Sequence, residues 1–227
     1  MEGLLASARE APVALNDVLS DAPVVRRPSY RFVKRAVDVV VAAAFLAILC
    51  PFLLPVAIAI KLSGSGPVFY KWDVIGRNGR PFTGYKLRTM VENADRQKAE
   101  LLHLNEMRGP VFKMHSDPRI TDVGRVLRKF SIDELPQLWS VLRGEMTLVG
   151  PRPAGPEEWK RYEPWQRRRL TVTPGITCLW QVKGRNRISD FGDWVRLDLQ
   201  YIDQWTLWLD FRIILQTVIV VLKGTGQ

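Results

Sequence analysis

The sequence predicts a mainly helical fold with a small β element, an α+β class, carried on a membrane-inserted helical segment. Residues 39–60 contain no charged side chain, residues 62–90 alternate short strand-like stretches with turns, and several later stretches place apolar residues at helical spacing. A helix needs roughly 20 apolar residues to cross the hydrocarbon core of a bilayer. The chain therefore combines a membrane element with a domain large enough to form its own core.

The composition points to an anionic partner. The chain has 227 residues, of which 47% are hydrophobic, and its formal net charge is +10. This excess favours nucleic acid, a phospholipid surface or a phosphorylated substrate. Cys50 and Cys178 are the only cysteines, so neither a disulfide framework nor a zinc site is expected. Residues 1–25 lack a clear periodicity and are expected to form a loosely ordered arm.

The apolar segment contains two helix breakers. Pro51 and Pro55 lie near its middle, where each removes a helical hydrogen bond and bends the helix. Basic residues flank both ends, which by the positive-inside rule favours the cytosol for both. Two arrangements fit: a helix–break–helix hairpin that enters the cytosolic leaflet and returns, or one bitopic helix with a proline kink. Lys34 and Asp38, four residues apart, are expected to pair on one helix face.

Short strands and turns are expected over residues 62–90. Residues 68–70 are strand-like, and Gly76-Arg-Asn-Gly79 is typical of a hairpin turn. Lys86 and Arg88 then share one side of an extended segment, because alternate side chains of a strand point to the same face. A polar helix is expected over about residues 91–107.

Two further helices are predicted near the middle of the chain. Thr121 is expected to cap a short helix that ends at Lys129. The next helix is expected to start at Ser131, because Ser131-Ile-Asp-Glu134 matches a Ser-x-x-Glu capping box. Inward-facing positions are expected at Val123, Val126 and Leu127 in the first helix and at Ile132, Leu135, Leu138 and Leu142 in the second.

The adjacent carboxylates Asp133 and Glu134 are the leading candidates for chemistry. At the positive end of a helix, an ionised carboxylate beside a phosphate site can be a nucleophile, a metal ligand or only a cap. Phosphoryl transfer needs cations, usually with a metal, to offset the charge that develops on a diphosphate. Arg152 lies between two prolines, which suits either a bidentate phosphate contact or a surface turn. The cations that could converge on the pair are Lys86, Arg88, Arg125, Arg128 and Arg152.

Features of the C-terminal part each have a functional and a structural interpretation. The loop around Gln181, Arg185 and Asn186 either offers donors to a phosphate or nucleobase or is a basic surface loop. Asp198 and Asp210 are either salt-bridged structural acids or acids that position a metal or a substrate cation. Residues 193–223 form a long aromatic-rich helical stretch, whose last part either packs in the core or lies in the membrane interface.

Common nucleotide-binding signatures are missing from the sequence. There is no Walker loop, no dinucleotide fingerprint and no Asp-x-Asp. Asp190-Phe-Gly192 matches a kinase triplet without the other kinase motifs, so we attribute the match to chance. No nucleic-acid-binding signature accompanies the positive charge, and nucleic acid is therefore not the expected partner.

Taken in order, the motifs between about residues 30 and 223 resemble the bacterial sugar transferase family, the monotopic polyprenyl-phosphate phosphoglycosyl transferases, in its short form. The one departure noted is Cys178, where the family more often has glycine. The motifs are Lys34-Arg-Ala-Val-Asp38, Gly66-Pro-Val-Phe69, Tyr85-Lys-Leu-Arg-Thr-Met90, Asp117-Pro-Arg119, Ser131-Ile-Asp-Glu-Leu-Pro-Gln-Leu138, Arg143-Gly-Glu-Met146, Val149-Gly-Pro-Arg-Pro153, Pro174-Gly-Ile-Thr177, Trp180-Gln-Val-Lys-Gly-Arg-Asn186 and Leu197-Asp198.

The resemblance implies a reaction and a set of roles. A sugar-1-phosphate would pass from a UDP-sugar to a polyprenyl phosphate such as undecaprenyl phosphate, with release of UMP. Asp133 would be the nucleophile that forms a phosphosugar-aspartate, and Glu134 would bind Mg²⁺. The remaining implied roles are phosphate binding for Lys86, Arg88, Arg128 and Arg152, nucleotide-sugar binding for Gln181, Arg185 and Asn186, and support of the site by Asp198 and Asp210.

The resemblance also favours the hairpin over the bitopic helix. The expected organisation is an arm (1–25), a basic flank and re-entrant membrane hairpin broken at Pro51 and Pro55 (26–61), and a cytosolic catalytic domain with interfacial amphipathic helices (62–227). The expected location is the cytosolic face of the bacterial inner membrane, where the phospholipid surface is a partner. A hexose is weakly favoured as the sugar, and a homo-oligomer is one arrangement that the sequence allows.

Overall fold

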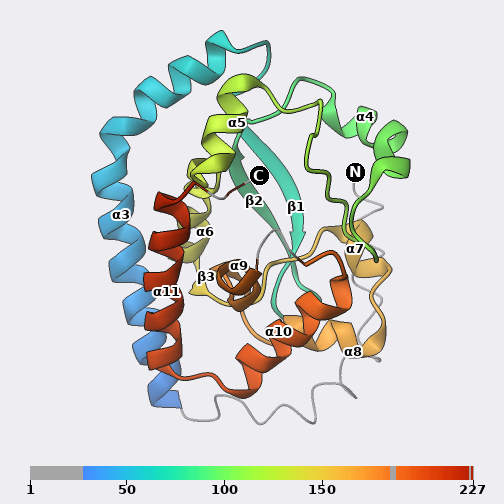
Figure 1. Cartoon of the computed structure of the whole chain (residues 1–227). Helices are drawn as coiled ribbons and strands as arrows, with labels where there is room; N and C mark the ends of the chain where they lie inside the picture. The colour runs from blue at the N-terminus through green and yellow to red at the C-terminus, as the bar shows by residue number, and fades with distance from the viewer. Residues whose placement is uncertain (1–27, 185–187, 225, 227) are drawn as a thin grey trace.

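The computed structural model describes residues 28–184, 188–224 and 226 (Figure 1). The predicted arm, residues 1–25, lies outside these residues. The helices are α3 (Pro28–Leu62), α4 (Ala94–Leu101), α5 (Asp122–Lys129), α6 (Gln137–Arg143), α7 (Pro156–Lys160), α8 (Pro164–Arg167), α9 (Leu179–Gly184), α10 (Phe191–Asp203) and α11 (Leu207–Leu222), with short 3₁₀ turns η1 (Arg77–Gly79), η2 (Leu102–Leu104), η3 (Ile132–Glu134) and η4 (Arg168–Leu170). The strands are β1 (Phe69–Ile75), β2 (Pro81–Leu87), β3 (Thr147–Val149) and β4 (Gly175–Thr177).

Two small sheets complete a mainly helical architecture, which confirms the predicted fold class. β1 and β2 form an antiparallel hairpin in which Phe69 lies opposite Leu87. Its turn contains Asn78 and Gly79, both with positive φ (57° and 73°), the conformation for which Asn-Gly sequences are suited. β3 and β4 pair in parallel. The predicted hairpin turn is therefore confirmed, and its second strand leads to Lys86.

The apolar N-terminal segment is one continuous helix. Pro51 and Pro55 both lie inside α3, so the predicted break into two helices is not found in the structure. Figure 1 shows instead that α3 runs along one side of the molecule and then bends over its end. A proline inside a helix removes one hydrogen bond and bends the axis, while the bonds on either side can keep the helix intact. Whether this bent helix re-enters one leaflet stays a prediction.

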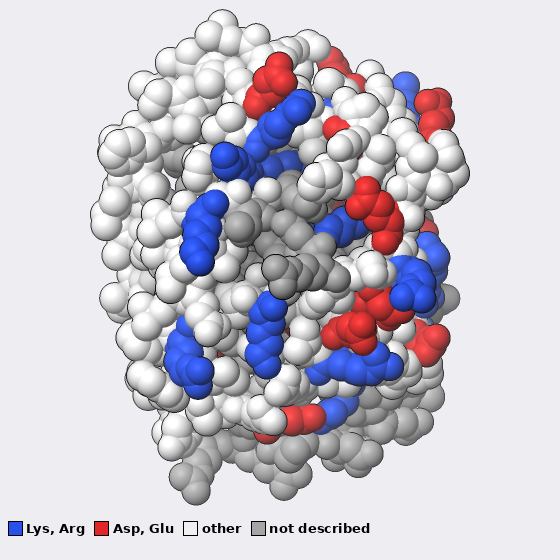
Figure 2. Space-filling model, viewed as in Figure 1, with Lys and Arg blue, Asp and Glu red and all other residues white. Residues whose placement is uncertain are grey.

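α3 is suited to lipid along most of its length. By length and composition it could cross a membrane, and only 6% of its most apolar window is buried within the molecule. Figure 1 shows α11 beside it, and α11 also exposes large apolar side chains, including Trp208 and Leu222. In Figure 2 the edge formed by α3 carries no visible charge, whereas charged side chains gather over the rest of this face. The two helices therefore offer an apolar surface beside a charged domain.

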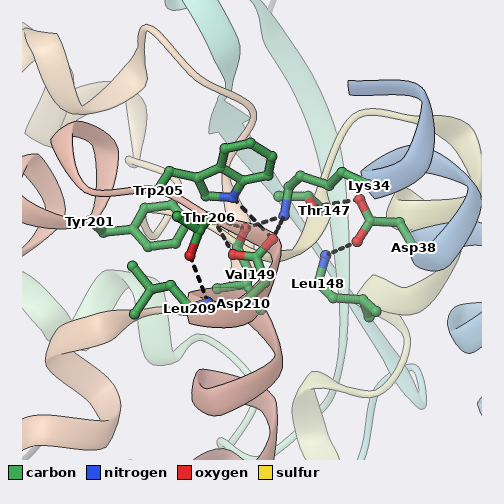
Figure 3. A network of polar contacts seen from close by, with 10 residues as sticks. All are labelled: Lys34, Asp38, Thr147, Leu148, Val149, Tyr201, Trp205, Thr206, Leu209 and Asp210. Carbon is green, nitrogen blue, oxygen red and sulfur yellow. Dashed lines mark hydrogen bonds and ion pairs between the residues drawn. The ribbon is translucent and has the colours of Figure 1, made fainter. Parts of the chain in front are cut away.

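Two buried acids fasten the basic end of α3 to the domain (Figure 3). Lys34 donates to Asp210 at 2.6 Å and to the Val149 carbonyl at 3.0 Å. Asp38 accepts a hydrogen bond from the Thr147 hydroxyl at 2.6 Å and another from the backbone N–H of Leu148. The predicted Lys34–Asp38 pair is therefore wrong. An isolated pair on one helix stabilises it by only about 0.2–0.5 kcal/mol, so buried partners from other elements prevail.

The other predicted helices are shorter than expected. α5 is capped by Thr121 as predicted, through a 3.0 Å bond from the Gly124 N–H, but Val126 is 56% exposed because so short a helix has only a narrow inner face. The polar helix over 91–107 is limited to α4 and η2. The stretch 193–223 is two helices, because the Thr206 hydroxyl accepts from the Leu209 N–H and starts α11 anew.

Candidate active site

A cavity of about 540 Å³ lies between the end of α3, the β1–β2 hairpin and the helices that follow. Both members of the acid pair line it, with four of the five cations that the sequence singled out beside them. Their segments are far apart in the chain, so the fold brings them together. The lining residues with potential chemistry are Lys86, Arg88, Asp117, Arg119, Arg128, Asp133, Glu134, Arg152, Glu158 and Arg169.

The acid pair lies on the 3₁₀ turn η3, not at the start of an α-helix. Ser131 adopts a left-handed conformation (φ 54°) and makes no side-chain cap hydrogen bond, so the predicted capping box is wrong. α6 begins only at Gln137. The reason is Pro136, which lacks an N–H and whose ring would clash with the carbonyl of residue 132 in a continuous helix. The acids thus lie on a tight 3₁₀ turn that begins after Ser131 and ends before Pro136.

Glu134 lies between two cations. Its Oε1 atom is 3.0 Å from Lys86 Nζ and 3.8 Å from an Arg152 nitrogen. Lys86 also lies over the Trp72 ring, 5.0 Å from its centroid, which fixes the long side chain from a second direction. The Arg152 side chain is still 36% exposed. Lys86, Arg152 and the acid pair therefore meet in the cavity, as predicted from the sequence.

Arg128 approaches the pair from the last turn of α5. Its Nε donates to the Thr89 hydroxyl at 2.9 Å, which holds the guanidinium at the cavity wall. Burial lowers the pKa of Arg128, and attraction to Asp133 opposes that decrease. Asp133 is itself only 8% exposed, so water screens this attraction little. A buried carboxylate with a cation nearby has the electrostatic setting that a nucleophile requires.

Arg88 borders the cavity, but its guanidinium is used elsewhere. It donates to the carbonyls of Ile60 (2.6 Å), Gly64 (2.7 Å) and Ser65. The Ile60 carbonyl lies in the last turn of α3, where helices leave acceptors without intrahelical partners, and the other two carbonyls follow the helix. Arg88 thus joins the membrane helix to β2, and its geometry favours a structural role over the predicted phosphate contact.

The two C-terminal acids lie behind the cavity, not in it. Asp198 is fully buried and forms an ion pair with Arg169 at 2.6 Å, and burial raises the pKa of Asp198 to about 6 against the opposing effect of Arg169. Arg169 does line the cavity, so Asp198 supports the wall through it. Asp210 belongs to the network that holds α3 (Figure 3). Both positions agree with the structural interpretation of these acids.

The predicted nucleotide loop is described only in part. Arg185 and Asn186 lie outside the described residues. The Gln181 side-chain oxygen accepts a hydrogen bond from the Cys178 N–H at 3.0 Å, within α9 and its entry turn. Gln181 therefore shapes the backbone before the loop. The role of the three residues in nucleotide binding stays a prediction.

A second ion pair in the cavity was not assigned a role from the sequence. Arg119 contacts both carboxylate oxygens of Asp117, at 2.9 and 2.6 Å, and each side chain is 5% exposed. Hydrogen bonds from Arg119 lower the pKa of Asp117, overcoming the opposing effect of burial. The Asp117-Pro-Arg119 motif was the available signal. Its two-residue spacing did not indicate that both side chains would face the acid pair.

Comparisons with known proteins identify the family of the chain. The described part of the chain combines an apolar helix long enough to cross a membrane with a cavity lined by acids and cations. The model of the bacterial sugar transferase family matches residues 29–224. The chain belongs to this family.

Individual relatives cover most of the chain. It is 46% identical over 201 residues to galactosyl transferase CpsE of Streptococcus agalactiae serotype III, matching 87% of this chain and 44% of that protein. It is 42% identical over 202 residues to undecaprenyl-phosphate galactose phosphotransferase of Salmonella typhimurium, matching 87% and 42%. It is 40% identical over 205 residues to exopolysaccharide production protein ExoY of Rhizobium meliloti, matching 88% and 90%. The chain thus spans less than half of the first two relatives and most of the third.

Proposed function

We propose that the protein transfers a sugar-1-phosphate from a UDP-sugar to a polyprenyl phosphate, such as undecaprenyl phosphate, and releases UMP. The observation that carries the proposal is the convergence of Asp133 and Glu134 with Lys86, Arg128 and Arg152 in one cavity. Family membership and the activity in the name of the Salmonella relative support it. The product would start the assembly of an exopolysaccharide, capsule, O-antigen or glycoconjugate, and the name of the Rhizobium relative points to exopolysaccharide.

The reaction would proceed in two displacements at one phosphorus atom. A carboxylate oxygen of Asp133 attacks the phosphorus that carries the sugar, and the bond from that phosphorus to the bridging oxygen breaks, so UMP leaves with the electron pair. A phosphate oxygen of the polyprenyl phosphate then attacks the same phosphorus. The aspartyl–phosphorus bond breaks, which regenerates the Asp133 carboxylate and gives a polyprenyl diphosphate sugar.

The cations have separate tasks in this scheme. The Arg152 side chain is more exposed than that of Lys86. Arg152 would therefore hold the phosphate of an incoming diphosphate that lies nearer the opening of the cavity. Lys86 would stay beside Glu134 and offset charge at the reacting phosphorus, and Arg128 would keep Asp133 ionised. Arg88 is left out, because its donors are directed at the end of α3. Gln181, Arg185 and Asn186 would contact the nucleotide.

The residues of the cavity fit Mg²⁺ in one particular mode. Among the described residues no group of three or more His, Cys, Asp or Glu side chains could hold a metal. Mg²⁺, however, is often held by one or two carboxylates together with substrate phosphates and water. Glu134 would be the protein ligand, assisted by the diphosphate. The ion would supply positive charge that offsets the charge on the transferring phosphoryl group.

The membrane arrangement follows from the substrates. A lipid-linked acceptor keeps its phosphate at the bilayer surface, and the cavity wall includes Ser65, Gly66 and Pro67, directly after α3. A monotopic α3 in the cytosolic leaflet of the inner membrane would bring the cavity to that surface. Cysteines at positions 28 and 63, introduced with Cys50→Ser, test this in inverted vesicles. Both should react with an impermeant maleimide from the cytosolic side, whereas labelling from opposite sides would contradict the monotopic arrangement.

The reaction is tested by assaying UMP release from UDP-galactose, UDP-glucose and UDP-N-acetylgalactosamine, with Mg²⁺ and undecaprenyl phosphate. Without the acceptor, intact-mass measurement should detect one added sugar phosphate. Asp133→Asn should abolish both the adduct and turnover. Asp203→Asn, which changes an exposed acid in an ion pair remote from the cavity, is the matched control and should retain both. An adduct that persists in Asp133→Asn would assign the nucleophile to another residue.

A further inference from the structure

A second cavity, of about 430 Å³, lies at the basic end of α3. Its wall is formed by the start of α3, turn η1, residues 171–173 and the corner between α10 and α11. The ionisable lining residues that the structure describes, apart from Tyr201, are Arg31, Lys34, Arg35, Arg77 and a single acid, Asp38. The cavity is therefore strongly positive and separate from the one that holds the acid pair.

Part of this charge is already compensated by the protein. Lys34 is paired with Asp210 at 2.6 Å. Arg35 donates to the carbonyls of Val141 and Leu142, where it completes the end of α6. Asp38 is occupied by two hydrogen bonds from β3. Arg35 and Asp38 also carry opposite charges, so these groups form the structured floor of the cavity and contribute little net charge to it.

The guanidinium groups of Arg31 and Arg77 are the two cations of this lining that the contacts above leave uncompensated. Neither Arg31 nor Arg77 has an acidic partner among the ion pairs of the described part of the chain. They lie near enough to repel each other: burial lowers the pKa of Arg77, and Arg31 and Arg80 lower it further. A fold that gathers like charges around a cavity lowers the free energy of an anion bound between them. Both side chains line the same cavity, so together they offer two positive charges to an anion bound there, and we call this pair the clamp.

The position of the clamp identifies the source of the anion. Tyr30 packs edge-on against Trp205, with ring centroids 6.3 Å apart, and Trp205 also lines the cavity. The adjoining surface of α3 is apolar, with Phe32 75% exposed. Aromatic rings next to arginines at the end of an apolar helix are typical of the headgroup layer of a membrane. An anion at this depth is the phosphate of a lipid.

We propose that this cavity binds the phosphodiester of an anionic phospholipid between Arg31 and Arg77. The polar wall beyond the clamp suits the rest of a headgroup, because Asn78 Oδ1 and Thr171 Oγ1 have no hydrogen-bond partner within the described residues. The bound lipid would neutralise the two arginines and hold the entry of α3 at the membrane surface. The proposal does not depend on the catalytic function, since the clamp and the acid pair line different cavities.

The test is native mass spectrometry of the full-length protein in detergent, titrated with phosphatidylglycerol or phosphatidylcholine of the same acyl chains. The wild-type protein should bind one phosphatidylglycerol with an affinity about tenfold above that for phosphatidylcholine, as expected for charge-assisted hydrogen bonds. The variant Arg31→Gln/Arg77→Gln should bind both lipids equally. Arg77→Gln alone should lose part of the preference, which keeps the test informative if the double variant melts early.

The matched control is Arg96→Gln/Arg161→Gln. It removes the same charge from exposed positions in and after α4 and α7, on the other side of the molecule from α3 (Figure 1). This control should keep the preference for phosphatidylglycerol. Equal binding of both lipids by the wild-type protein, or a preference that survives Arg31→Gln/Arg77→Gln, would overturn the proposal. Displacement of the lipid by excess inorganic phosphate would assign the clamp to free phosphate instead.

Discussion

Two clusters of charged side chains in this molecule contain similar groups but differ in what surrounds them. In the cluster around Asp210, the carboxylate accepts from Lys34, Tyr201 and Trp205, and the Val149 carbonyl accepts from Lys34 and Tyr201 (Figure 3). In the cluster around Glu134, Lys86 and Arg152 approach one oxygen at the wall of a cavity.

The difference separates structural from chemical use of the same residue types. A closed cluster satisfies its charges with protein groups, so it stabilises one arrangement of elements and keeps no unpaired charge for a ligand. An open cluster keeps cations that face a cavity, and a diphosphate can replace their present contacts. We therefore expect substitutions in the closed cluster to change stability and substitutions in the open cluster to change activity.

The largest effect is expected for Asp210→Ala. The change leaves Lys34 without its acidic partner and removes one of the two acceptors of the Tyr201 hydroxyl, which should lower the free energy of unfolding by about 3 kcal/mol. Thermal unfolding in detergent measures the loss, and UMP release well below the melting temperature should stay close to that of the wild-type protein. Normal stability with abolished turnover would place Asp210 among the chemical residues after all.

Glu134→Gln is expected to lower activity and leave stability nearly unchanged, the reverse of the result expected for Asp210→Ala. Glutamine keeps the shape but removes the charge between Lys86 and Arg152, so turnover should fall by about 100-fold, while the melting temperature changes little. If Glu134 holds Mg²⁺, the variant should also need more Mg²⁺ for half-maximal rate. A variant with unchanged turnover and a large loss of stability would remove the distinction between the two clusters.

The sequence allowed the open cluster to be predicted better than the closed one. Asp133, Glu134, Lys86, Arg128 and Arg152 stand in motifs whose residue types match phosphoryl transfer, and all five line the cavity. The capping box was predicted wrongly because Ser-x-x-Glu is a local pattern, and the effect of the proline two residues later was not weighed against it.

The closed cluster could not be predicted, because its contacts join distant segments. Lys34 and Asp210 are separated by 176 positions, and nothing near either residue specifies the other. A local rule favoured Asp38 as the partner of Lys34, and tertiary packing overrode it. The helical content was predictable from periodicity, whereas the division between α10 and α11 depends on a single cap at Thr206.

Arg88 shares features with both kinds of cluster. Its side chain borders the cavity, yet its donors are directed at carbonyls in and just after the last turn of α3. Arg88→Lys cannot reproduce the forked contacts and should lower the free energy of unfolding by about 1–2 kcal/mol. The KM for the UDP-sugar should be unchanged. A raised KM at normal stability would restore the phosphate-binding role predicted from the sequence.

The smallest effect is expected from Asp117, whose ion pair with Arg119 lies in the cavity but is closed upon itself. Hydrogen bonds from Arg119 lower the pKa of Asp117 below its ordinary value of 3.8. A carboxyl with a lowered pKa in the folded state stabilises the fold above pH 3.8, and this contribution is lost as the pH falls towards the folded-state pKa. Asp117→Asn should therefore lower the melting temperature at pH 7 and reduce its dependence on pH below 4. Asp122→Asn, on an exposed acid nearby in the chain, should leave the acid dependence unchanged, and equal acid profiles for all three proteins would show that the Asp117–Arg119 pair contributes no stability.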